Sequence, residues 1–70
     1  MEFYFEVKGD PTDIADWMDD LGLLYYISTW DESYNRGYTL FRTKDIDYNE
    51  YDDIIQSLEY DGWEVVEVKS

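Results

Sequence analysis

The chain has 70 residues, with 18 Asp and Glu against five Lys and Arg, and a formal net charge of −13. This length predicts one domain over residues 1–70, near the size at which a single hydrophobic core only just offsets the entropy of ordering the chain. Without Cys or His, the chain lacks disulfides, a thiol nucleophile and the commonest general base. Its negative charge disfavours direct contact with nucleic acid or anionic lipid and favours basic partners.

The first strand is expected over residues 2–8, where EFYFEVK alternates apolar and polar side chains and Phe3, Phe5 and Val7 share the buried face. A helix is expected to begin next, with Asp10 at its N-cap and Pro11 at its first position. Four apolar residues then recur at helical spacing, and a glycine follows as the left-handed stop. These residues are Ile14, Trp17, Met18, Leu21 and Gly22.

Residues 23–43 predict a β-hairpin, because two runs rich in strand formers, LLYYISTW and YTLFRT, flank the turn-forming stretch DESYNRG. A second helix is expected to begin at Asp47, since Glu50 three residues later completes a capping-box pattern. Its apolar positions repeat the spacing of the first helix, and WEVVEVK over residues 63–69 predicts the last strand. The stripe consists of Tyr51, Ile54, Ile55 and Leu58, and Gly62 ends the helix.

The resulting β-α-β-β-α-β order predicts an α+β fold of the ferredoxin-like type, a two-layer sandwich in which two helices cover one face of a four-stranded antiparallel sheet. Another small α+β arrangement is the alternative. The uncovered sheet face would carry Tyr4, joined either by Leu40 and Tyr38 or by Phe41 and Thr39, and strand 2 offers Tyr26 and Trp30. An aromatic face with an acidic rim favours a protein partner or homodimer, although exposed Tyr can also simply suit β-structure.

The stretch DIDYNEYDD over residues 45–53 is the densest acidic segment, and its first part matches a calcium-binding loop at Asp45, Asp47 and Asn49. The match ends there, because Glu50 replaces the required Gly and Gln56 replaces the bidentate Glu. The glycines are isolated, so no phosphate-binding loop is expected either. The sequence predicts no metal site, no cofactor and no enzymatic activity.

Acidic residues lie off the apolar stripe of both expected helices, where neighbouring side chains stand roughly 5–6 Å apart. That spacing is comparable to phosphates along a nucleic-acid strand, at about 3.4 Å of rise each, so a rigid acidic face could occupy a groove built to hold DNA or RNA. A solvated surface that serves only solubility is the alternative. The candidate partner-binding residues are Asp13, Asp16, Asp19, Asp20, Asp45, Asp47, Glu50, Asp52, Asp53, Tyr4, Tyr26 and Trp30.

In its size and charge, the whole chain resembles phage-encoded inhibitors of host defence, which include anti-CRISPR proteins and other DNA mimics. The motif YDGW, Tyr60 to Trp63, also resembles the junction of helix and final strand in the regulator of ribonuclease activity B family, acidic inhibitors of an RNA-degrading enzyme. Both resemblances imply that the chain blocks a nucleic-acid-handling protein by occupying its basic surface.

The leading hypothesis is therefore an acidic inhibitor or regulator of a basic nucleic-acid-binding protein, such as a viral antagonist of a bacterial defence complex. The alternative is a small structural or ligand-sensing module that dimerises through its open sheet face. The start of the chain lacks the basic segment of a signal peptide, and no apolar run approaches the roughly 18 residues of a membrane span. A cytoplasmic location is expected, in the host cell if the protein is viral.

Overall fold

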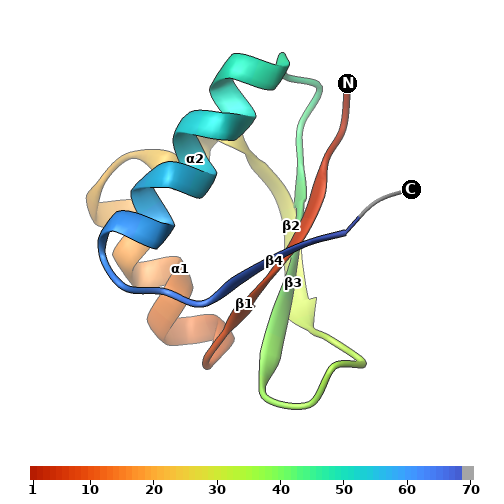
Figure 1. Cartoon of the computed structure of the whole chain (residues 1–70), viewed down its shortest axis with the longest axis vertical. Coiled ribbons are helices and arrows are strands. Elements are labelled where there is room, and N and C mark those ends of the chain that lie inside the picture. The colour runs from red at the N-terminus through yellow and green to blue at the C-terminus, as the bar shows by residue number, and fades with distance from the viewer. Residues whose placement is uncertain (69–70) are drawn as a thin grey trace.

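The computed structural model describes residues 1–68, which form one four-stranded antiparallel sheet with two helices packed against it (Figure 1). The strand order in the sheet is β2-β3-β1-β4, and every neighbouring pair is antiparallel. The predicted α+β class and the ferredoxin-like element order are thereby confirmed. The elements are β1 (Tyr4–Lys8), α1 (Pro11–Asp20), the 3-10 helix η1 (Leu23–Tyr26), β2 (Ile27–Glu32), β3 (Tyr38–Thr43), α2 (Tyr48–Tyr60) and β4 (Val65–Val68).

Both helices begin where the sequence predicts. The Asp10 carboxylate accepts a 2.9 Å hydrogen bond from a backbone N–H in the first turn of α1. At α2 the capping box is complete, because Asp47 accepts from the Glu50 N–H at 2.8 Å and the Glu50 side chain accepts from the Asp47 N–H at 3.4 Å. Gly22 and Gly62 follow the helices with φ of 74° and 95°, the left-handed conformation that only Gly adopts freely.

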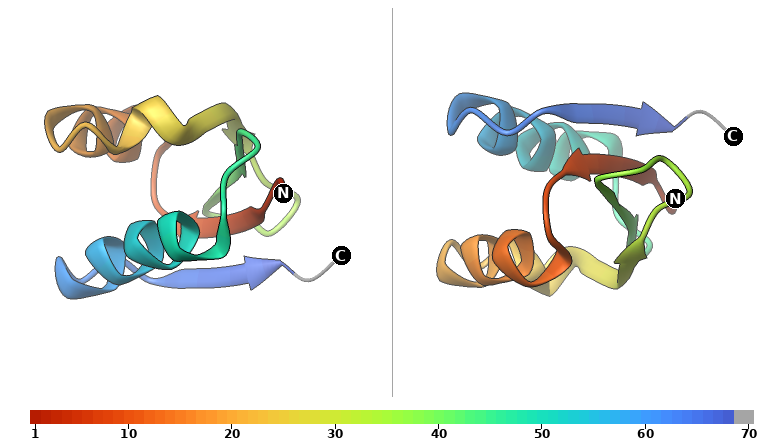
Figure 2. Two further views of the ribbon diagram at one scale, coloured as in Figure 1. Left: turned by 90° about the horizontal axis from the view of Figure 1, so that it is seen from above. Right: turned by 90° about the horizontal axis from the view of Figure 1, so that it is seen from below.

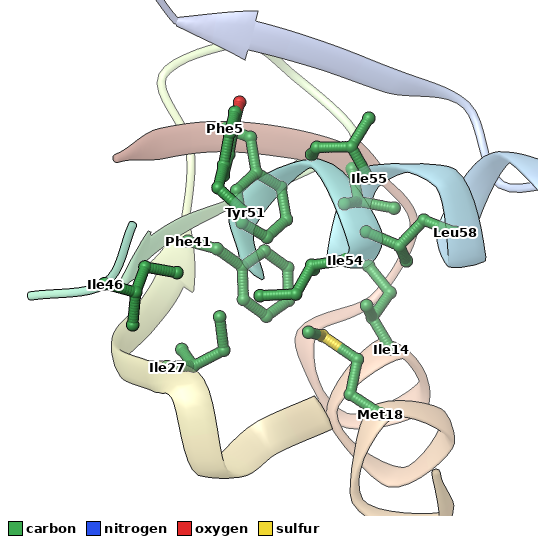
Figure 3. Packing of buried hydrophobic residues seen from close by; sticks show 11 residues of the cluster. Phe5, Ile14, Met18, Ile27, Phe41, Ile46, Tyr51, Ile54, Ile55 and Leu58 are labelled. Carbon is green, nitrogen blue, oxygen red and sulfur yellow. The ribbon is translucent and has the colours of Figure 1, made fainter. Parts of the chain in front are cut away.

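The core lies between the helices and the sheet, and two stacked rings occupy its centre (Figure 3). Phe5 of β1 and Phe41 of β3 are fully buried, with centroids 5.2 Å apart. The whole predicted stripe of α2 is buried against them, as are Ile14 and Met18 of α1. Burial of this much aliphatic and aromatic surface is the main term that offsets the self-repulsion of the charge.

The predicted hairpin is wrong at its start, because residues 23–26 form η1 rather than strand and β2 begins only at Ile27. Leu23 and Leu24 are both partly buried against the core, which consecutive residues of an alternating strand could not achieve. The α1 stripe also departs from prediction at Leu21, which is 57% exposed. The first and last strands of the chain, β1 and β4, begin later than the predicted residues 2 and 63. Lys69 lies outside the described residues.

Two further views show how the helices are placed (Figure 2). They lie together on one side of the molecule, and the ends of α1 and α2 that come last in the chain both point away from the N-terminus. Within residues 1–68, no helix combines the length and the apolar character needed to cross a membrane.

Candidate functional site

Charge is strongly separated between the two layers of the fold. Residues 10–20 and 45–61, which contain both α-helices, hold 12 of the 18 acidic residues and no Lys or Arg. The Lys and Arg residues of the described chain lie elsewhere: Lys8 and Arg42 belong to β1 and β3, Arg36 to the β2–β3 loop, and Lys44 follows β3. The helical layer therefore presents carboxylates without any neutralising side chain of its own.

Five of the predicted partner-binding acids are exposed on the helices, and within residues 1–68 their carboxylates take part in no hydrogen bond or ion pair. Four lie on α1 and one on α2, which the sequence predicted from their positions off the apolar stripes. Because these carboxylates form no hydrogen bond or ion pair within residues 1–68, they are available to a partner. These residues are Asp13, Asp16, Asp19, Asp20 and Asp53.

The remaining predicted acids have partners within the chain. Asp47 and Glu50 form the capping box of α2, and Asp45 pairs with the amino group of Met1. Asp52 accepts a 2.6 Å hydrogen bond from the Gln56 amide one turn later. Within the described residues, no group of three or more acids is placed to hold a metal ion. The dense segment 45–53 thus has a structural role in starting α2, beside any contact it makes with a partner.

The open face of the sheet is the second candidate surface. Directly opposed residues of an antiparallel pair project to the same face, and the pairing of Tyr4 with Arg42 and Val68 places all three away from the helices. Leu40 and Val66 both stand opposite Glu6 on the same face. Of the two sets predicted to join Tyr4, the one with Leu40 and Tyr38 is therefore the one observed. This face is mixed rather than acidic, because Lys8 and Arg42 lie among its apolar side chains.

Two of the three predicted aromatic anchors do not belong to that face. Tyr26 lies in η1, half-buried against the core, so it has no place on strand 2. Trp30 stands opposite Phe41, and this register directs it to the helix-covered side at the edge of the sheet, where it is 39% exposed. A β-bulge between Ile27 and Thr29 shifts the alternation of β2, which no pattern in the sequence reveals.

Sequence reasoning missed an open groove of about 480 Å³ between the two helices. Tyr60 is 96% exposed at its edge, while the partly buried Trp17 packs edge-on against Trp63 with ring centroids 5.9 Å apart. The available signal was the position of Tyr60 outside the α2 stripe, but a local pattern cannot show that α1 supplies the other wall. The groove is lined by Trp17, Leu21, Gln56, Ser57, Tyr60 and Asp61.

A second open groove, of about 510 Å³, lies between the start of α2, the start of β1 and the end of β4. Phe3 and Tyr51 stack there with ring centroids 4.2 Å apart. Its acids already have partners, since Glu67 accepts a 2.9 Å hydrogen bond from the Tyr51 hydroxyl and Glu2 pairs with Arg42 at 2.8 Å. This groove consequently offers an apolar surface with little free charge.

Burial raises the pKa of Tyr51 well above its usual value of 10.0, and the hydrogen bond to Glu67 raises it further. Below pH 10 the phenol is neutral in both the folded and the unfolded chain. As the pH rises above 10, the unfolded chain loses this proton while the folded chain keeps it, so the free energy of unfolding should fall. We expect Tyr51→Phe to be less stable than the wild type at pH 7, and the difference to shrink above pH 10. Urea unfolding across this range measures it, and a constant difference would contradict the assignment.

Comparison of the chain with protein-family models, curated proteins and solved structures finds no match. The functional argument therefore depends on the geometry and charge of the surfaces described above.

Proposed function

We propose that the protein is an acidic inhibitor or regulator that binds the basic nucleic-acid-binding surface of another protein, as a phage antagonist of a bacterial defence complex such as an anti-CRISPR protein would. The observation that carries this proposal is the helical layer, which holds 12 of the 18 acids and no cation. A surface kept only for solubility has no need to exclude Lys and Arg from both helices, because mixed charges serve solubility as well.

The proposed mechanism is the occupation of a site built for phosphates. Acids one helical turn apart stand roughly 5–6 Å from one another, and α1 fixes Asp13, Asp16 and Asp20 at such spacings without flexible linkers. The long-range field of −13 charges would steer the protein towards a basic groove and speed encounter. Binding would then exclude the nucleic acid by occupying its site, so the proposal assigns recognition rather than catalysis.

The test is a pull-down from bacterial lysate at low salt, followed by calorimetric titration of the captured partner at increasing salt. Neutralised charges release counterions, so we expect the affinity to fall by roughly tenfold or more between 50 and 200 mM salt. The partner's own DNA or RNA should compete for the complex. Binding that is insensitive to salt, or that leaves nucleic-acid binding intact, would contradict the proposal.

A homodimer formed through the open sheet face is the second candidate, and a specific observation favours it. Val66 and Val68 are each 42% exposed there, and Tyr4 stands opposite Val68. Sedimentation of the isolated chain separates the two candidates. A stable dimer that buries these valines supports the homodimer, whereas a chain that is monomeric in both low and high salt shows that the open sheet face has no role in self-association.

A further inference from the structure

The groove between the helices combines an apolar wall with the negative ends of both helix dipoles. Its lining includes Leu21 and Asp61, which are the C-cap residues of α1 and α2 respectively. The two C-terminal ends therefore flank the same groove, in agreement with their common direction in Figure 2. Each end carries roughly half a negative charge on its last carbonyl groups, and such ends are normally complemented by Lys or Arg.

Neither helix supplies that complement. The last turns of α1 and α2 contain no basic residue, and acids stand there instead: Asp19 and Asp20 on α1, and Glu59 and Asp61 around the end of α2. These carboxylates add to the dipoles rather than offsetting them. The groove is thus a place where a cation supplied from outside would relieve repulsion already present in the fold.

The apolar side chains determine which cation fits. Tyr60 and Leu21 are 96% and 57% exposed, and the partly buried Trp17 lines the same groove. An Arg side chain can lay its aliphatic stem along such a surface and stack its planar guanidinium on an aromatic ring, which the compact ammonium of Lys does less well. An uncharged apolar segment would gain nothing from the surrounding carboxylates, and a nucleic acid would be repelled by them.

We propose that this groove, lined by Trp17, Leu21 and Tyr60 between the C-terminal ends of α1 and α2, receives an Arg side chain from the basic surface of the partner. The inference rests on the proposed function and locates its central anchor. The groove between the start of α2, the start of β1 and the end of β4 does not serve this purpose, because Glu2 and Glu67 there are already paired with Arg42 and Tyr51. The exposed carboxylates of α1 would contact further cations around the anchored Arg.

The test uses a tri-arginine peptide, acetylated and amidated, titrated into the full chain at low salt and followed by the indole N–H signals in a ¹H–¹⁵N spectrum. We expect the Trp17 signal to shift most, since Trp17 lines the groove. Tyr60→Ala should lower the affinity for the peptide by roughly two- to fivefold, which is the range expected for the loss of an exposed cation–π contact. The matched control is Tyr34→Ala, which removes an equally exposed Tyr in the β2–β3 loop, outside the groove. It should bind like the wild type.

Equal peptide affinity of Tyr60→Ala and Tyr34→Ala would overturn the groove assignment, as would a Trp17 signal that stays unshifted at saturation. Tri-lysine provides a second measurement, and tighter binding of tri-lysine than of tri-arginine would also count against a stacked guanidinium. None of these results would refute the proposed function. That proposal fails on its own test, if the partner binds without salt dependence.

Discussion

Replacing Asp16, Asp19 and Asp20 by Asn is expected to stabilise the fold and weaken binding to a basic partner at the same time. All three carboxylates are exposed on α1, and within residues 1–68 none is hydrogen-bonded or ion-paired. Asp19 and Asp20 lie in the last turn, where the helix dipole disfavours negative charge. Neutralising either of these two residues is expected to raise the free energy of unfolding by about 0.3–1 kcal/mol.

The effect on binding has the opposite sign. Exposed charge pairs contribute about 0.2–1 kcal/mol each, so three lost pairs should cost about 0.6–3 kcal/mol, or roughly 3- to 150-fold in Kd. Urea unfolding and calorimetric titration measure the two quantities on the same variant. A rise in stability together with a fall in affinity separates a functional role for these acids from a structural one.

The control is the triple variant Glu6→Gln, Asp31→Asn and Glu64→Gln. It removes the same number of charges from the open-face side of the sheet, where Asp31 stands opposite Leu40 and the Glu64 carboxylate accepts from the Tyr38 hydroxyl. The amides keep an acceptor for each hydrogen bond. The control should bind the partner far better than the α1 variant. Equal loss in both would show that net charge alone, rather than the helical array, determines binding.

The parts of the fold that the sequence predicted are those encoded by neighbouring residues. The capping box of Asp47 and Glu50 needs only a spacing of three, and the buried stripe of α2 needs only helical periodicity. The alternation of Phe3, Phe5 and Val7 likewise identified the buried face of β1, because pleat geometry depends on the chain locally. Local rules of this kind also identified the exposed acids of α1.

What the sequence could not predict depends on contacts between distant segments. Trp30 changes face because of a bulge in β2, and Tyr26 leaves the strand because residues 23–26 form η1. The partners of Asp45 and Glu67, which are the Met1 amino group and the Tyr51 hydroxyl, lie 44 and 16 residues away. The groove at Tyr60 forms only when two helix ends meet, and the expectation that Leu21 would be buried concealed it.

Phe5→Ala is expected to have the largest effect on stability. Phe5 is fully buried, stacks on Phe41 with centroids 5.2 Å apart and lies 6.1 Å from the ring of Tyr51. Truncation of such a residue costs about 3–5 kcal/mol, because the cavity left behind closes only in part. At about 0.05–0.15 kcal/mol per residue, the free energy of unfolding of the whole domain is about 4–10 kcal/mol. Repulsion between the carboxylates places the value near the lower end of this range.

We therefore expect Phe5→Ala to be partly or wholly unfolded at 25 °C in low salt, measured by circular dichroism and by the dispersion of its amide signals. Added salt screens the repulsion between carboxylates and should restore part of the native signal. Val66→Ala is the matched control, because it shortens a side chain on the neighbouring strand β4 that is 42% exposed on the open face. If Phe5→Ala unfolded with the same urea midpoint as Val66→Ala, the core between the helices and the sheet would not be the main source of stability.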